Sequence, residues 1–195
     1  METEAMTLLI DPLEESDIER DKRFILSKIR NRKPTGKYKG ADVYYLGDSQ
    51  NGYVALAKNE QLLYFVRHES VRHNKLPLGR QVMVWSAGSV PGSAAYASTG
   101  FAAHVFFDYL LPKYKALIAD KQQTDAGFRF WKYAINRALQ EHKYVYFLNR
   151  RSTPNQLIHL QSDEDVEKYA HQMWGFNTGH LLTFAIISKI PFVLK

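Results

Sequence analysis

The sequence predicts an α+β fold with a mixed, mostly antiparallel sheet and one βαβ unit. Three observations predict this fold: a helix-like stretch near the start, several short strand-like runs separated by turn residues, and a second half in which strand-like and helix-like runs alternate. A strand, a helix and a strand joined by short connections are typical of a parallel βαβ unit. No repeat or linker interrupts the 195 residues, so we expect a single domain over residues 1–195.

The first half is predicted to be a helix followed by an antiparallel meander. Residues 13–30 carry an apolar stripe at helical spacing, formed by Ile18, Phe24, Ile25, Leu26 and Ile29. Residues 31–40 then break the helix with proline and glycine. Strands are expected at residues 41–47, 52–59, 61–68 and 80–86, and Asn51-Gly52 predicts a hairpin turn between the first two.

The second half is predicted to alternate between helices and strands after a small-residue loop at residues 87–100. Helices are expected at residues 101–114, 127–142 and 162–174, and strands at 115–120, 143–149 and 180–188. A turn is expected at residues 150–156. One stripe of the middle helix, formed by Phe128, Trp131, Ile135 and Leu139, is expected to face the core.

Composition excludes several classes of protein. Apolar residues make up 45% of the chain, which predicts a hydrophobic core, and the absence of cysteine excludes disulfides, Cys-ligated zinc and a thiol nucleophile. The acidic N-terminus does not resemble a signal peptide, and the apolar run "LLTFAIIS" is far shorter than the roughly 20 residues of a membrane helix. We therefore expect a soluble cytoplasmic protein without a membrane partner.

Charge is distributed unevenly along the chain. Residues 1–19 carry seven acids and no Lys or Arg, whereas Arg20 to Lys39 contain nine Lys/Arg and the single acid Asp21. We divide the chain into an acidic leader with a basic helix and loop (1–39) and a sheet core (40–195). The basic segment suits phosphates or an acidic protein surface. The alternative is a solvated basic helix face followed by a flexible loop.

A polar turn between the strand at 115–120 and the next helix is the first candidate site. Amides in the first turn of a helix are unpaired and lie at the positive end of its dipole, so they can hold a phosphate. The turn "QQTDAG" contains Gly127, which permits close approach of a ligand, and polar donors at Gln122, Gln123 and Thr124. Thr124 or Asp125 is equally suited to capping the helix, and the Asp125 carboxylate would repel a phosphate.

The order of elements from about residue 40 to 190 resembles the GNAT-type N-acetyltransferase superfamily. Its pyrophosphate loop, Q/R-x-x-G-x-G/A, is matched at Gln122 and Gly127, whereas Asp125 replaces the first glycine. Gly175-Phe176 resembles the Gly-Phe pair that ends the family's later helix. The pattern "D-x-x-Q-T-x-x-G-x-x-F-W" from Asp120 to Trp131 is also similar to uncharacterised GNAT-like proteins of phages and prophages, which implies a location in the host cytoplasm.

The resemblance implies an acyl-CoA donor such as acetyl-CoA and an amine acceptor. Its pyrophosphate would lie on the backbone amides from Gln123 through Ala126 to Phe128, and a splayed strand pair beside residues 116–120 would hold the pantetheine. The family's acid is often a tyrosine four residues before the Gly-Phe glycine. Here His171 occupies that place and Tyr169 lies two residues earlier, so either His171 substitutes or the acid is absent; a surface histidine is the structural alternative.

Other polar and aromatic residues have weaker functional interpretations. Asp120 ends a predicted parallel strand, where it can act as a base or bond the neighbouring backbone. Neither His68 with His73 nor His104 with Asp108 makes a complete ligand set, so we expect no metal site. The strand tyrosines suit base stacking or ordinary sheet packing. They are Tyr44, Tyr45, Tyr53 and Tyr64.

Two functions from different classes follow from the sequence. One is an acyl-CoA-dependent N-acyltransferase with a degenerate pyrophosphate loop. The other is a non-catalytic GNAT-like protein that binds a protein or nucleic acid through the Arg20–Lys39 segment, Arg150-Arg151 and aromatic side chains.

Overall fold

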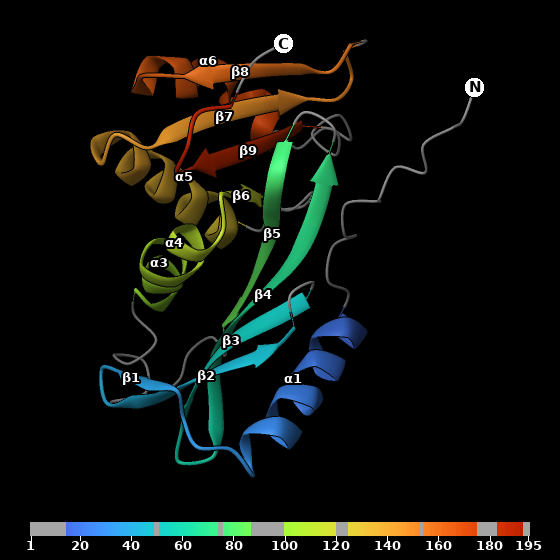
Figure 1. The fold of residues 1–195 in the computed structure, drawn as a ribbon, viewed down its shortest axis with the longest axis vertical. Coiled ribbons are helices and arrows are strands. Elements are labelled where there is room, and N and C mark those ends of the chain that lie inside the picture. Colours follow the sequence, from blue (N-terminus) through green and yellow to red (C-terminus); the bar gives the residue numbers. More distant parts are fainter. Residues whose placement is uncertain are drawn as a thin grey trace, which may run out of the picture. The chain divides into compact units, whose positions relative to one another are not determined.

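The computed structural model describes residues 15–48, 51–73, 76–86, 100–119, 125–152, 154–174 and 183–192. As predicted, this part of the chain is α+β, with nine mostly antiparallel strands, α-helices and one π-helical turn (Figure 1). It divides into two compact units. Residues 13–70 and 82–109 form what we call the hairpin unit, and residues 71–81 and 110–195 lie in the C-terminal unit. The prediction of one domain stays a prediction.

The hairpin unit is built from one helix, consecutive antiparallel strands and a second helical segment. Its elements are α1 (Glu15–Ile29), β1 (Gly36–Tyr38), β2 (Ala41–Gly47), β3 (Asn51–Lys58) and β4 (Gln61–His73), then β5 (Leu76–Ser86), α3 (Phe101–His104) and the π-helical turn η1 (Val105–Leu110). The strands lie in the order β1-β2-β3-β4-β5. Both β4 and β5 also contribute residues to the C-terminal unit.

Two tight turns in the hairpin unit have the positive φ angles of a type I′ hairpin. Lys39 (φ 47°) and Gly40 (φ 78°) connect β1 to β2, and Asn59 (φ 50°) and Glu60 (φ 64°) connect β3 to β4. The matching twist of this turn type and of the strands favours hairpins with two-residue loops. The first turn corrects the sequence interpretation, because residues 36–38 form a strand where a loop was expected.

The predicted hairpin between β2 and β3 is confirmed, but its turn lies earlier than expected. Asn51 and Gly52 already belong to β3, where they pair with Glu69 and His68 of β4. The reversal is closed by Asp48, whose backbone N–H donates to the Asn51 carbonyl (2.9 Å) and whose carboxylate accepts from the Asn51 N–H (2.8 Å). An aspartate that bonds backbone three residues on thus defines this turn.

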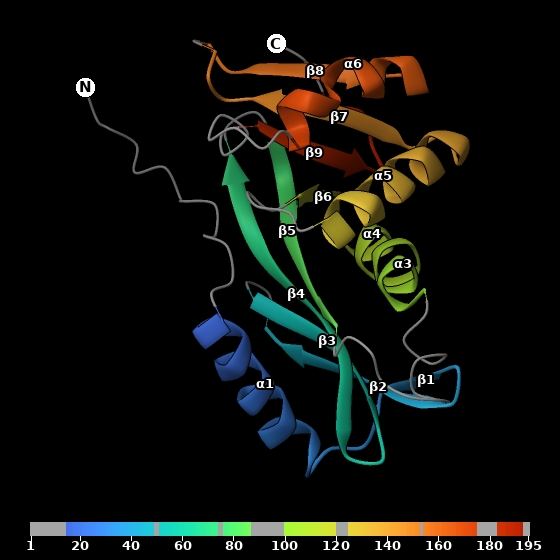
Figure 2. The same cartoon turned by 180° about the vertical axis from the view of Figure 1, so that it is seen from behind.

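Helix α1 lies along the strands of the hairpin unit in both views (Figures 1 and 2). Ile25 and Ile29 are buried against Leu46 of β2 and Phe65 of β4, among other residues of one apolar cluster. The helix predicted over residues 13–30 is confirmed for its described part. Phe24, however, was expected in the apolar stripe and is 39% exposed.

The C-terminal unit contains a four-stranded antiparallel sheet and two long helices. Its elements are α4 (Leu111–Lys113), β6 (Ala116–Ala119), α5 (Asp125–Gln140), β7 (Tyr144–Asn149), β8 (Gln156–Leu160), α6 (Asp163–Trp174) and β9 (Thr183–Ser188). Strand β8 was missed in the sequence because its residues are mostly half-buried and lack clear alternation. Within this unit these four strands lie in the order β6-β9-β7-β8.

The strand–helix–strand segment β6-α5-β7 departs from a simple βαβ unit. Both β6 and β7 are antiparallel to β9, so they are parallel to each other, as predicted. Strand β9 lies between them and hydrogen-bonds to both. Strand β9, the last in the described part of the chain, therefore completes the centre of this sheet.

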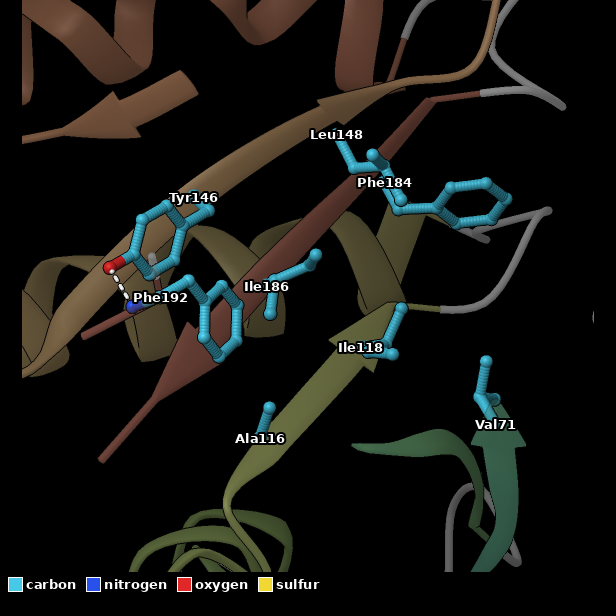
Figure 3. Packing of buried hydrophobic residues seen from close by; sticks show 8 residues of the cluster. All are labelled: Val71, Ala116, Ile118, Tyr146, Leu148, Phe184, Ile186 and Phe192. Carbon is cyan, nitrogen blue, oxygen red and sulfur yellow. Dashed lines mark hydrogen bonds between the residues drawn. The ribbon is translucent and has the colours of Figure 1, made fainter. Parts of the chain in front are cut away.

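Both faces of the C-terminal sheet are covered, each by a different set of side chains. Side chains from alternate positions of β6, β7 and β9 form one cluster, shown in Figure 3, in which the Phe192 ring stacks on Tyr146 (4.5 Å between centroids). The Tyr146 hydroxyl accepts a hydrogen bond from the Phe192 backbone N–H (2.9 Å). On the other face, Phe147 stacks on Tyr169 of α6 (4.9 Å), and the buried Trp131 and Ile135 of α5 confirm part of its predicted core stripe.

Gly52 is expected to be intolerant of a side chain. An added Cβ would lie 2.5 Å from Cε1 and 2.6 Å from Nε2 of the buried His68 imidazole. Gly52→Ala should therefore lower the free energy of unfolding by about 1–3 kcal/mol, the usual cost of overpacking. Gly36→Ala is the matched control, since nothing lies within 4 Å of its added Cβ. Urea unfolding measures the free energy of unfolding of both variants. Equal values would contradict the close packing of Gly52 against His68.

Candidate functional site

Helix α1 presents one buried and one exposed face. Asp21, Ile25 and Ile29 recur every four residues and are buried toward the strands. The opposite face is exposed and mostly cationic; its residues are Arg20, Arg23, Phe24, Ser27 and Lys28. The helix therefore holds a basic face away from the strands on which it packs.

A buried polar network attaches the inner face of α1 to β3 and β4. The Asp21 carboxylate is only 2% exposed. It accepts a hydrogen bond from the Tyr53 hydroxyl (2.9 Å) and another from the Arg67 guanidinium (3.2 Å). Arg67 also pairs with Glu69. Each oxygen of the buried carboxylate thus has a partner, as burial of a charge requires.

The network changes the acid–base properties of its members. Burial, together with the hydrogen bond to Asp21, raises the pKa of Tyr53 to about 12. For Arg67, the charges of Glu69 and Asp21 outweigh burial and raise the pKa further above its usual value. Tyr53 is therefore a neutral donor and Arg67 a fixed cation at physiological pH.

The exposed cations beyond this network are mostly without acidic partners. Arg23, Arg30, Arg32 and Lys33 are exposed and make no ion pair within the described part of the chain. Lys37 approaches Asp42 only to 3.9 Å, in an exposed pair of little energetic weight. The segment from Arg20 to Lys39 has a formal charge of +8, which exceeds the +6 of the whole chain.

One exposed aromatic ring lies among these cations. Phe24 is 39% exposed and tilts against the Tyr53 ring, with 5.5 Å between centroids. The Lys28 ammonium lies 5.5 Å from the Phe24 centroid. We call the combined set the α1–β1 basic surface; its members are Arg20, Arg23, Phe24, Lys28, Arg30, Arg32, Lys33, Lys37 and Lys39.

The strand tyrosines are engaged in packing. Tyr45 stacks on Tyr109 at 4.0 Å, and Tyr64 makes an edge contact with Phe101 at 5.6 Å. Tyr53 is held by Asp21. These contacts support the sheet-packing interpretation. The exposed ring, Phe24, was missed because the sequence analysis grouped it with the apolar stripe.

The residues expected to hold acyl-CoA are only partly described. Asp120, Gln122, Gln123 and Thr124 lie outside the described residues, as do the side chains of Asp125 and Ala126. Helix α5 begins at Asp125, so Gly127 lies in its first turn. Phe128 makes an edge contact with Trp174 at the end of α6 (5.4 Å). The start of α5 and the end of α6 therefore lie together.

The expected catalytic residues of α6 do not share one environment. Tyr169 is half-buried with its ring on Phe147, whereas His171 is exposed. On one side of β6, Ala116 to Ile118 pair regularly with β9, so no splay exists between these two strands at those residues.

The histidines do not assemble a metal centre within the described residues. His104 Nδ1 and the Asp108 carboxylate are 2.8 Å apart, and the imidazole stacks on Tyr38 at 4.8 Å. His68 is buried beside Gly52, while the side chain of His73 lies outside the described part. Among the described residues, no group of three or more potential ligands gathers.

Comparison of the chain with protein-family models, curated proteins and solved structures found no match. The resemblance to the GNAT superfamily therefore stays a prediction. None of the described helices is long and apolar enough to cross a membrane.

Tyr53→Phe is expected to reduce stability at pH 7 and to lose this effect at alkaline pH. The pKa of Tyr53 rises from 10.0 to about 12 on folding. Its neutral hydroxyl therefore stabilises the fold fully below pH 10, and this contribution disappears as pH rises through 12. Urea unfolding between pH 8 and 12 should show the gap between wild type and variant narrowing.

The control is Tyr133→Phe, which removes the hydroxyl of an exposed side chain of α5. Its free energy of unfolding should stay close to that of wild type over the same pH range. A Tyr53→Phe gap that stays constant up to pH 12 would refute the stabilising role of the neutral hydroxyl.

Proposed function

We propose that this protein binds nucleic acid through the α1–β1 basic surface. The observation that carries the proposal is the group of exposed cations that have no acidic partner in the described chain, namely Arg23, Arg30, Arg32 and Lys33. Their charge is available to an external anion. A nucleic acid offers regularly spaced phosphates, and its bound counterions are released when cations replace them.

The chemistry of the surface suits phosphate groups. Four of the nine cations between residues 20 and 39 are arginines, whose planar guanidinium can donate two parallel hydrogen bonds to one phosphate. The lysines add point charges along the same segment. A surface of this kind binds a polyanion with little dependence on base sequence.

The surface suits an acidic protein less well. The centres of protein–protein interfaces are depleted in charged residues and rich in apolar ones. Residues 30–37 are all exposed, and their sequence RNRKPTGK has proline as its sole apolar member. Such a segment can approach phosphates along its length but provides no apolar centre for a protein interface.

Replacing Arg23, Arg30 and Lys33 together with alanine is expected to weaken binding to a fluorescent oligonucleotide. Loss of three phosphate contacts should reduce the slope of log K against log salt by about 2 for a single strand. Anisotropy titrations between 50 and 200 mM salt measure both the affinity and the slope.

The control triple variant replaces Lys115, Arg129 and Lys168, which are exposed in the C-terminal unit. It removes the same total charge but leaves the α1–β1 basic surface intact. Equal losses in the two variants, or wild-type binding that does not depend on salt, would overturn the proposal.

Acyl transfer remains a second hypothesis that rests on the sequence resemblance. It requires acetyl-CoA to stabilise the fold, by about 2.7 kcal/mol at 100 times the dissociation constant. Our proposal predicts instead that millimolar acetyl-CoA raises the melting temperature no more than the same concentration of inorganic pyrophosphate. A larger shift with acetyl-CoA would favour the transferase.

A further inference from the structure

Phe24 is the most exposed of the described apolar side chains of α1. It lies on the exposed face of α1 with 39% of its surface open to solvent, while Ile25 beside it is fully buried. Helical geometry places Arg20 and Lys28 four residues away on either side and Arg23 next to it. An aromatic ring is thus displayed within a cationic helix face.

The Phe24 ring is held in place by the strand side chain on which it packs. Its contact with Tyr53 is fixed by the hydrogen bond from the Tyr53 hydroxyl to the buried Asp21 carboxylate. The Lys28 ammonium near the ring belongs to an exposed side chain. A ligand can therefore displace the ammonium toward a phosphate without disturbing the packing of α1.

We infer that the α1–β1 basic surface selects single-stranded nucleic acid by stacking one base on Phe24. This inference rests on the proposed function and names its ligand class. The phosphates that flank the stacked base lie against Arg23 and Lys28. Binding of single strands commonly combines a cationic track with aromatic rings on which bases stack.

A duplex cannot use this ring in the same way. Its bases are already stacked on one another, so it presents phosphates to the surface and no free base face. The duplex has the higher charge density, and cations alone would therefore favour it. A preference for single strands thus reports on the ring and not on the charge.

The other exposed large apolar side chains of the described chain lack this setting. Val84 has no ring. Tyr133 of α5 also has cations beside it, but Lys132 and Arg137 are each paired with a glutamate. Phe24 is therefore the residue to test, because the basic segment around it contains exposed cations that make no ion pair within the described chain.

The experiment compares a 20-nucleotide oligothymidine with a 20-base-pair duplex. Phe24→Ala should weaken binding of the single strand by about tenfold, within the range known for loss of one stacked base, and leave duplex binding unchanged. Phe24→Leu should weaken binding of the single strand about as much as Phe24→Ala, although it keeps apolar volume. Phe24→Trp, which keeps an aromatic ring, should bind the single strand as tightly as wild type. Arg23→Ala should weaken both ligands.

The outcomes separate the two proposals. Equal losses for single strand and duplex in Phe24→Ala, or unchanged binding of both, would overturn the stacking inference while leaving nucleic-acid binding intact. Wild-type protein that binds neither ligand at 50 mM salt would overturn both. Thermal unfolding of each variant confirms that the fold persists, and a folded Phe24→Leu with full affinity would also refute stacking.

Discussion

The buried carboxylate of Asp21 sets the position of α1, and the properties of the hairpin unit depend on it. Ile25 and Ile29 supply apolar contact, which has little directional preference. Asp21 supplies direction, because its oxygens must meet the Tyr53 hydroxyl and the Arg67 guanidinium at the same time. Leaving a buried charge without partners is costly. Rotation of the helix about its axis is therefore disfavoured, and its cationic face stays exposed.

This arrangement separates the charges of the hairpin unit. The acids Asp21 and Glu69 are paired with Arg67 beneath the helix, and among the outer cations Arg20 approaches Asp21 to 3.9 Å. Glu19 is paired with Lys22 on the same helix. Beyond the helix, β1 and its turn carry Lys37 and Lys39 in a hairpin rather than in a loop. Residues 36–38 of the basic segment therefore form a strand where a loop was expected.

Much of the fold could be predicted from local sequence patterns. The helices and central strands follow from periodicity, since alternating or helical spacing of apolar residues directly reflects burial. The misses have physical causes. Strand β1 contains only exposed or half-buried residues, and its pairing depends on the positive φ of Lys39 and Gly40. The insertion of β9 between β6 and β7 depends on long-range pairing that no local pattern contains.

The candidate site was less accessible from the sequence. The basic segment was visible as composition, but Asp21 looked like a lone acid within it, although that residue holds the segment in place. Phe24 was grouped with the apolar stripe, although at 3.6 residues per turn it lies about 100° from Ile25 around the helix. For the acyl-CoA hypothesis, the sequence contributes the Gln122–Gly127 pattern. For the same hypothesis, the described structure shows that α5 begins at Asp125 and that His171 is exposed.

The most direct test of a nucleic-acid surface on α1 and β1 is photo-cross-linking followed by peptide mapping. A single-stranded oligonucleotide that carries 4-thiothymidine would be irradiated with the full chain, and the modified peptides would be identified by mass spectrometry. The account predicts that cross-links fall between Arg20 and Lys39, with Phe24 among the modified residues. Cross-links confined to α5, α6 or Arg150-Arg151 would contradict it.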